Sequence, residues 1–237
     1  MANDTAVIVT AFNEADRLPA TLSALAAAFP GARLLVADDG STDGSAEVAA
    51  ANGAEVVRSE RNIGKGGVAT LAAQRLLPLA EAPEPRPVIL LCDGDLAASA
   101  DALTLLVEEV RAGRADLAIA AFARRVGGGF GWALGFARWA IRTRCGYEAG
   151  APISGQRALR ADVLPAVLPF APRFGMEIGM TIDAVRAGFR VREVELPLAH
   201  RATGKTLRGF LHRGRQLLDF VAVYLARRTG RRIRARG

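Results

Sequence analysis

Two carboxylates separated by one residue, Asp93 and Asp95, stand directly after the apolar run Val88–Cys92. In an extended segment, residues two apart point to the same side, so these carboxylates would repel each other unless a cation lay between them. Mg²⁺ prefers a few carboxylates together with phosphate oxygens, which suits an ion bridging protein and diphosphate. Such an ion would also neutralise charge on a departing nucleotide diphosphate. The alternative is a solvated turn, because acids are common in turns.

Two further polar clusters follow apolar runs in the same way. Asn13 and Glu14 come after the run 5–11, and Asp38 and Asp39 come after the run 32–37. At the tip of a strand, a carboxylate could accept the N–H of a nucleobase. Both clusters also fit ordinary turns, in which Asp43 would cap the following helix.

A glycine-rich segment, Asn62–Gly67, precedes a helical pattern and contains Lys65. Glycines before a helix expose backbone N–H groups to an anion, and Lys65 adds positive charge. The spacing is not that of a Walker loop, and the first strand is not followed by G-x-G-x-x-G, which argues against a dinucleotide site. A flexible turn remains the alternative.

Two titratable residues lie further along the chain. Glu177 stands in the apolar segment Phe174–Ile178, where burial would raise its pKa and make it a candidate base; an exposed helix acid is the other interpretation. His200 could ligate a metal as neutral imidazole or contact phosphate, although a lone histidine is more often structural. We take Glu177 and Asp95 as the candidate catalytic residues.

The pattern of apolar residues predicts the elements that position these groups. In the first half, strands alternate with helices, which indicates a parallel sheet with helices on both faces and ligands at the carboxyl ends of the strands. The expected strands are 5–11, 32–37, 54–58, 87–92, 117–121 and 189–197. The expected helices are 16–29, 43–51, 65–79, 100–112, 130–143, 161–168, 175–187 and 207–225, with a flexible joint at Gly127–Gly129.

Length and composition suit one large α/β domain with a short appendage: the chain has 237 residues and is 51% hydrophobic. Its two cysteines, Cys92 and Cys145, cannot form a disulfide framework and fit a reducing compartment. The first residues lack the features of a signal peptide, and no run approaches the roughly 20 apolar residues that span a bilayer. We therefore expect a cytoplasmic protein.

The C-terminal part is strongly basic. Residues from Arg201 onward carry eleven Lys or Arg and one Asp, whereas residues 1–200 carry twenty basic and twenty-three acidic residues. The helix 207–225 has an apolar stripe that includes Leu218 and Leu225 and is widened by Phe220 and Val223. This tail therefore suits the inner face of an anionic membrane at about 1 kcal/mol per cation. Packing of the stripe on the domain is the alternative. We expect no nucleic-acid partner, because few aromatic residues interleave with the charges.

Several motifs in order resemble one known family. The segments Val7–Glu14, Ala37–Gly44, Asn62–Gly67 and Asp93–Asp95 resemble the GT-A fold glycosyltransferases of family 2. The later segments Pro152–Arg157, Phe174–Glu177 and His200–Lys205 resemble the branch that contains polyprenyl-phosphate sugar synthases. The match extends from residue 5 to about residue 206, and the ordered set is far more specific than any single motif.

The resemblance implies a transferase that uses a UDP- or GDP-type sugar, usually inverts the anomeric carbon in one displacement, and depends on Mg²⁺ or Mn²⁺. The expected nucleotide contacts are Thr10, Ala11, Phe12, Glu14, Asp38, Asp39, Lys65 and Asp93. The expected metal ligands are Asp93, Asp95 and His200, and the expected phosphate or acceptor contacts are Gln156, Arg157, Arg201 and Lys205. We divide the chain into a catalytic domain 1–206, with a nucleotide half 1–98 and an acceptor half 99–206, and a tail 207–237.

The acceptor stays open at this point. Polyprenyl-phosphate relatives often have an acid shortly before the Ser-Gly pair, but here Gly150–Ser154 holds none, and no transmembrane helices follow the catalytic domain. A lipid phosphate acceptor needs no strong base, whereas a hydroxyl acceptor would need Glu177 to take its proton. The alternatives are a soluble transferase onto a small hydroxylated or phosphorylated acid, a non-catalytic binding module, and a nucleotidyltransferase, which Asn13-Glu14 disfavours.

Overall fold

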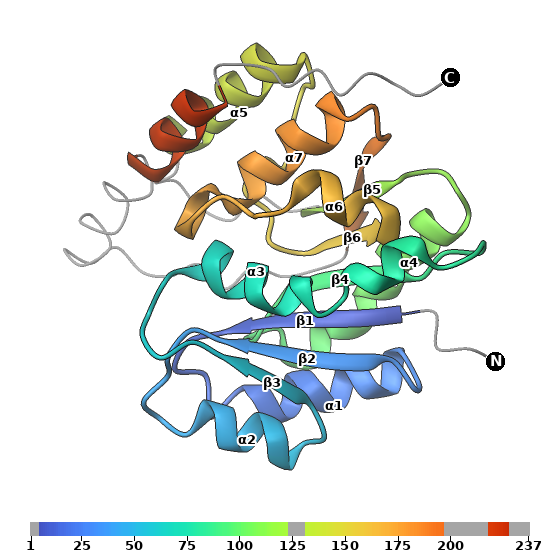
Figure 1. Ribbon diagram of the computed structural model, residues 1–237, viewed down its shortest axis with the longest axis vertical. Coiled ribbons are helices and arrows are strands. Elements are labelled where there is room, and N and C mark those ends of the chain that lie inside the picture. Colours follow the sequence, from blue (N-terminus) through green and yellow to red (C-terminus); the bar gives the residue numbers. More distant parts are fainter. Residues whose placement is uncertain (1–4, 123–130, 197–217, 228–237) are drawn as a thin grey trace.

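The computed structural model describes residues 5–122, 131–196 and 218–227 (Figure 1). Within these residues, seven strands form one sheet in the order β3-β2-β1-β4-β6-β5-β7. Neighbouring strands are parallel except at β6, which runs antiparallel to both β4 and β5. The strands are β1 (Thr5–Ala11), β2 (Arg33–Asp38), β3 (Glu55–Arg58), β4 (Val88–Asp93), β5 (Leu117–Phe122), β6 (Arg157–Arg160) and β7 (Val191–Leu196).

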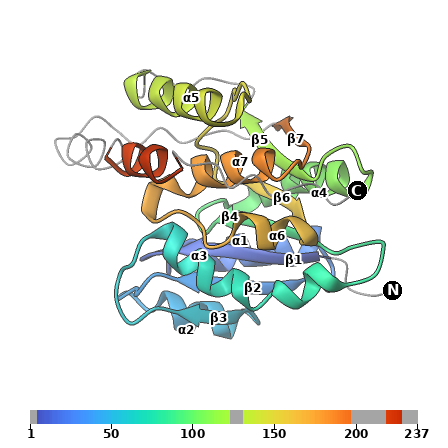
Figure 2. The same cartoon turned by 45° about the horizontal axis from the view of Figure 1, so that its top comes forward.

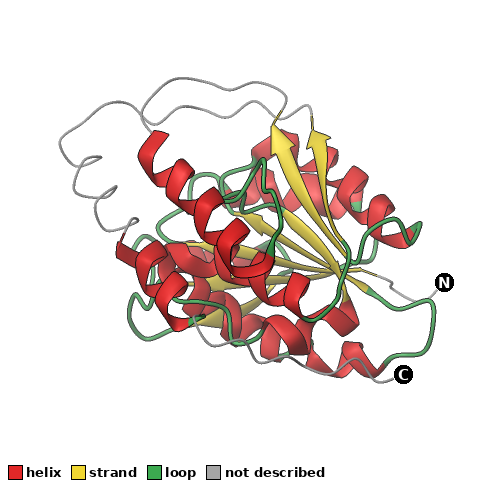
Figure 3. Cartoon of the chain, turned by 90° about the horizontal axis from the view of Figure 1, so that it is seen from above, coloured by secondary structure: helices red, strands yellow, loops and turns green. Residues whose placement is uncertain are grey.

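Helices cover both faces of this sheet (Figure 3). They are α1 (Leu18–Ala28), α2 (Ser45–Ala51), α3 (Lys65–Gln74), α4 (Thr104–Arg111), α5 (Gly131–Cys145), α6 (Leu164–Val167) and α7 (Met176–Arg186). Short 3₁₀ helices occupy Leu77–Glu81, Ala97–Leu103, Ala161–Val163 and Arg173–Gly175, and residues 218–226 are helical.

The core explains why the first strand is apolar at nearly every position. Side chains alternate between the faces of a strand, so a strand covered on both faces reads as a continuous apolar run. In β1, Val7 and Val9 pack into a cluster with α1 and α4, whereas Ala6 and Ile8 pack into a second cluster with α3, α6 and α7.

A third layer lies outside α7. Ile141 of α5 and Phe220 and Val223 of the segment 218–226 form a separate buried cluster with Ile178 and Ile182 of α7. Figure 2 shows α5 above α7 and the C-terminal helical segment beside α7. The C-terminal helix therefore packs on the domain through one of its faces.

The predicted α/β fold with a mostly parallel sheet is confirmed, with three local differences. The expected helix 65–79 ends at Gln74, because the ring of Pro78 would clash with the carbonyl four residues earlier. The helix expected at 100–112 is a 3₁₀ helix until Leu103. The antiparallel strand β6 was not predicted at all.

Several predictions lie outside the described residues. They concern the joint at Gly127–Gly129, the candidate contacts His200, Arg201 and Lys205, and the first part of the helix 207–225. Within the described part of the chain, no helix is long and apolar enough to cross a membrane.

Candidate active site

The carboxyl ends of β1, β2 and β4 meet at one rim of the sheet. Thr10 pairs with Asp93 across β1 and β4, and Ala11 pairs with Asp38 across β1 and β2. The backbone N–H of Asp39 donates to the carbonyl of Ala11 at 3.0 Å. The acids after β2 and β4 therefore lie at the same edge of the sheet, as the sequence predicts for parallel strands.

The loops after β1 and β2 are joined by side chains. Asn13, in the left-handed region with φ 56°, accepts the N–H of Thr42 at 2.9 Å. Asp43 accepts the N–H of Ala15 at 3.0 Å through one oxygen and the N–H of Ser45 at 3.0 Å through the other. Asn and Asp are the residues that tolerate such conformations and bond to nearby backbone. These hydrogen bonds thus fix the loops after β1 and β2 relative to each other at this edge of the sheet.

The carboxylate of Asp39 is bound by the segment that leads into α3. It accepts the N–H of Ile63 at 2.7 Å and that of Gly64 at 2.9 Å. Burial raises the pKa of Asp39, although these backbone bonds and the Ser59 hydroxyl oppose the rise. Asp38 is fully buried, and its carboxylate lies 3.2 Å from the guanidinium of Arg58.

Asp93 lies at the centre of a second cluster, which also contains Lys65 and Glu177. The ammonium of Lys65 lies 2.6 Å from Oδ1 of Asp93 and 2.9 Å from Oε1 of Glu177. The hydroxyl of Thr10 donates to the same Oδ1 at 3.2 Å, and Nε2 of Gln156 donates to Oδ2 at 3.0 Å. Residues from β1, α3 and the segment before β6 therefore converge on the carboxylate of Asp93 at the end of β4, and Glu177 of α7 joins the cluster through Lys65.

Lys65 and its carboxylate partner Asp93 shift each other's pKa values against the effect of burial. Burial would raise the pKa of Asp93, but the Lys65 ammonium, with hydrogen bonds from Lys65, Thr10 and Gln156, outweighs it and lowers the pKa. Burial would lower the pKa of Lys65, but the carboxylates of Asp93 and Glu177 raise it. Gly155 closes the site, since a Cβ there would lie 2.5 Å from Nζ of Lys65.

Asp95 is exposed at the mouth of the same rim. Burial raises the pKa of the Glu14 carboxyl, Arg17 opposes the rise, and the carboxylate of Asp95 adds to it. Asp95 and Glu14 are therefore close enough to interact, although they follow different strands. Phe12 is exposed beside them, whereas Ala11 is a buried residue of β1.

Arg157 does not suit its predicted contact with phosphate. Its side chain is fully buried, and the guanidinium donates to the carbonyl of Ser154 at 2.8 Å and to the hydroxyl of Thr181 at 2.9 Å. Burial lowers the pKa of Arg157 to about 10. Arg157 is therefore a positioning residue: its hydrogen bonds fix the turn from which Gln156 reaches Asp93. Gln156 is likewise bonded to Asp93 within the cluster.

Sequence reasoning missed Ser59 and Thr181 as partners of site residues. Ser59 donates to a carboxylate oxygen of Asp39 at 3.4 Å, and Thr181 accepts from Arg157. Neither residue has a local signal, because each partner is distant along the chain.

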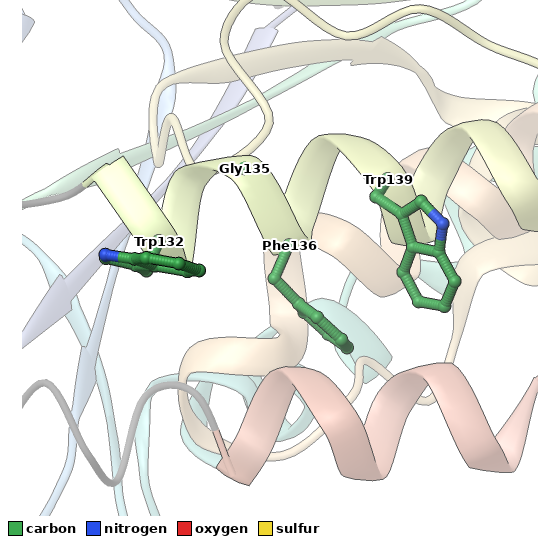
Figure 4. Close-up of a pocket in the computed structure, with 4 residues that line it drawn as sticks. All are labelled: Trp132, Gly135, Phe136 and Trp139. Carbon is green, nitrogen blue, oxygen red and sulfur yellow. The ribbon is translucent and has the colours of Figure 1, made fainter.

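An aromatic surface lies on α5, away from the sheet. Trp132, Phe136 and Trp139 line an open pocket of about 460 Å³, with Gly135 between them (Figure 4). Trp132 is 94% exposed. Tyr224 of the C-terminal segment stacks against Trp139 with ring centroids 4.7 Å apart, and the guanidinium of Arg144 lies 3.6 Å over the Tyr224 ring. We call Trp132, Phe136 and Trp139 the aromatic face.

A mostly parallel sheet with an acid pair after β4 and a glycine-rich turn before α3 defines the GT-A class of transferases. The model of glycosyl transferase family 2 matches residues 6–164, and the chain belongs to this family of enzymes.

Two curated relatives are similar over most of their length. An uncharacterised glycosyltransferase of Mycobacterium tuberculosis is 32% identical, and the match covers 94% of this chain and 99% of the length of that relative. The undecaprenyl-phosphate mannosyltransferase of Micrococcus luteus is 32% identical over 84% of this chain and 85% of its own.

Solved structures of glucosyl-3-phosphoglycerate synthase from Mycobacterium tuberculosis have the same fold. The complex with Mg²⁺ and UDP has a TM-score of 0.73 and 26% identity, covering 95% of this chain and 79% of that one. The complex with Mn²⁺, UDP-glucose and phosphoglyceric acid has a TM-score of 0.71 and 25% identity, and the match covers 95% of this chain and 80% of that one.

Proposed function

We propose that this glycosyltransferase moves a sugar from a UDP- or GDP-type sugar nucleotide to an acceptor held on the Glu177 side of the rim. The observation that carries the proposal is the convergence of Lys65, Thr10 and Gln156 on Asp93, beside the exposed carboxylate of Asp95. In one displacement, the bond from the sugar to the diphosphate breaks as an acceptor oxygen forms the new bond, which inverts the anomeric carbon.

The donor set fits a divalent ion bound jointly with diphosphate. Among the described residues, no group of three or more His, Cys, Asp or Glu side chains could enclose a metal by itself. Mg²⁺ needs only one or two carboxylates where substrate phosphates complete its shell, and Asp93 and Asp95 supply two. When bound, Mg²⁺ or Mn²⁺ would neutralise the departing diphosphate. We also propose His200 as a ligand from the sequence alone.

The loops after β1 and β2 are our proposed nucleoside site. Thr10, Phe12 and Glu14 border it from β1, and Asp38 and Asp39 border it from β2. In the described arrangement Asp39 already binds the backbone of Ile63 and Gly64, so it would act partly by fixing the shape of the site.

We favour a lipid-linked phosphate as the acceptor. Trp132 and Trp139 of the aromatic face are exposed, and Leu218 and Leu225 of the adjoining C-terminal segment are 69% and 55% exposed. Trp side chains with basic neighbours, here Arg138 and Arg142 on the same helix, suit the interface of an anionic membrane. The relative from Micrococcus luteus, named for undecaprenyl phosphate, supports the same choice.

A small phosphorylated acid is the second candidate. The similar synthase structures contain phosphoglyceric acid beside UDP-glucose. For either phosphate acceptor, we propose Arg201 and Lys205 as contacts, again from the sequence. A lipid phosphate would attack through an ionised oxygen and would not need Glu177 as a base, whereas a hydroxyl of a small acid would need Glu177 to take its proton.

A thermal-shift panel tests the donor. UDP-, GDP- and dTDP-sugars are each added with and without Mn²⁺, and one nucleotide should stabilise the protein only when metal is present. Asp95→Ala should abolish this metal dependence. If Asp95→Ala retains it, or if no nucleotide benefits from Mn²⁺, the metal assignment is wrong.

Transfer assays with undecaprenyl phosphate in vesicles and with 3-phosphoglycerate in solution separate the acceptors. Flotation with anionic vesicles then tests the surface: Trp132→Ser should weaken vesicle binding about tenfold. Leu105→Ser is the matched control, because Leu105 is an exposed apolar residue on α4. Equal effects of the two substitutions would contradict a specific aromatic face.

A further inference from the structure

The chain uses lysine very sparingly, and one of its few lysines is in the site. Lys65 and Lys205 are its only lysines among 31 basic residues. The other ion pairs that we find within the described residues all use arginine. Lysine carries a compact point charge, whereas the guanidinium of arginine is a planar fork. A compact cation is required here, because a Cβ at Gly155 would already lie 2.5 Å from Nζ.

The ammonium of Lys65 lies between two carboxylates from distant elements, much as a small metal ion would. It reaches Asp93 at the end of β4 at 2.6 Å and Glu177 in the first turn of α7 at 2.9 Å. Oδ1 of Asp93 receives Lys65 and Thr10, and Oδ2 receives Gln156. Oδ1 of Asp93 therefore already accepts two donors, so a divalent ion that binds Oδ1 must displace Lys65 or Thr10.

The helix ends act in opposite senses on Glu177 and Lys65. Glu177 lies at the N-terminal end of α7, where the helix dipole favours negative charge. Lys65 is the first residue of α3, where the same effect disfavours positive charge, so Lys65 depends on its carboxylate partners. If Asp93 is taken by another cation, Glu177 remains as the partner for Lys65.

We propose that Lys65 is the exchangeable counter-ion of Asp93, which it releases to a divalent ion while keeping its contact with Glu177. Metal binding on the donor side would thereby change the charge balance at the carboxylate on the acceptor side. The exchange needs no proton transfer, since the ammonium stays charged throughout. This proposal rests on the metal dependence in the proposed function.

Mn²⁺ binding without nucleotide, measured by electron paramagnetic resonance, tests the competition. Lys65→Met should bind Mn²⁺ about tenfold more tightly than the wild type, because a competing charge within hydrogen-bond distance is removed. Glu177→Gln should bind it more weakly, because Lys65 then has Asp93 as its only anionic partner. Arg61→Met, which removes an exposed charge from the segment before α3, should change the affinity less than about twofold. Unchanged or weaker binding by Lys65→Met overturns the proposal.

Nuclear magnetic resonance of the wild type gives a test that does not depend on a variant folding. With ¹⁵N-labelled lysine, the chain has only two side-chain ammonium signals to distinguish. The Lys65 signal should shift in a saturable manner as Mg²⁺ is added. An unmoved signal, while calorimetry detects Mg²⁺ binding, overturns this proposal alone. A wild type that binds no Mn²⁺ even with UDP overturns the metal dependence itself, and this proposal with it.

Discussion

The carboxyl ends of β2 and β4 each present an aspartate to the same rim, but the partners of the two aspartates differ in kind. Asp39 accepts backbone N–H groups of Ile63 and Gly64, which are neutral and fixed by the chain. Asp93 is held by the ammonium of Lys65 and by two polar side chains. The pKa of Asp39 is raised by burial, whereas the pKa of Asp93 is lowered because the Lys65 charge outweighs burial.

Asp39 is therefore a carboxylate that holds a loop in place, whereas Asp93 is a carboxylate that can change partners. Backbone donors cannot leave Asp39 without unfolding the segment before α3, so Asp39 belongs to the framework of the site. Side-chain partners can leave Asp93 by rotation about their own bonds. The sharpest tests therefore apply the same substitution to both aspartates.

Asp93→Asn should lower kcat/KM for sugar transfer about 100- to 1,000-fold, because it removes the charge that would hold a cation on the diphosphate. Steady-state kinetics with the sugar nucleotide identified by thermal shift measure this loss. Asp39→Asn should lose no more than about tenfold. Equal losses of kcat/KM would contradict the distinction between Asp93 as a holder of the cation and Asp39 as a holder of the loop.

Gly155→Ala should disturb the β4 side alone. Its Cβ would lie 2.7 Å from Oδ2 of Asp93, so the Lys65–Asp93 contact must open, and the free energy of unfolding should fall by about 1–3 kcal/mol. Gly135→Ala is the control, because nothing lies within 4 Å of a Cβ there and the residue is helical. Chemical denaturation should show no loss of stability for the control.

Asp39→Asn should lower the free energy of unfolding by about 1–2 kcal/mol, since the amide can accept through only one atom and leaves a backbone N–H unpaired. Hydrogen exchange at Ile63 and Gly64 should accelerate with it. Unchanged protection of both amides would show that Asp39 does not hold this segment.

The two aspartates should respond to acid in opposite directions when metal is absent. The contribution of Asp93, whose pKa is lowered, is present above its ordinary value of 3.8 and is lost as pH falls through the folded-state pKa. The contribution of Asp39, whose pKa is raised, is present below 3.8 and is lost as pH rises through the folded-state pKa. Acidification should thus shrink the destabilisation by Asp93→Asn and enlarge that by Asp39→Asn.

The nucleotide half of the fold was predictable because its signals are local. The runs that became β1, β2 and β4 are apolar on both faces, and each ends in acids, so their convergence follows from parallel pairing alone. The strand β6 carries no such signal: Arg157–Arg160 is four residues long and basic at both ends. Its burial is decided by the partners that tertiary packing supplies.

Contacts between distant parts of the chain also could not be predicted from the sequence. Nothing near Lys65 indicates that its ammonium reaches Glu177, since that pairing depends on how α3 and α7 pack on one face of the sheet. In the C-terminal helix, the apolar stripe was predicted, but Phe220 and Val223 at its margin are the buried residues. Leu218 and Leu225, within the stripe, are exposed, because α5 and α7 contact the other side.

The reversed direction of β6 has a consequence for how such an enzyme can be altered. A parallel strand brings the residue after its end to the rim, but β6 brings the residue before its start, Gln156, because it enters the sheet at that edge. The end of the connection preceding β6 therefore acts on the site directly, since Gly155 packs against Lys65 and Gln156 bonds to Asp93. An exchange of this connection that keeps Gly155 and Gln156 in place would leave the contacts on Asp93 intact while changing the chain that leads to them.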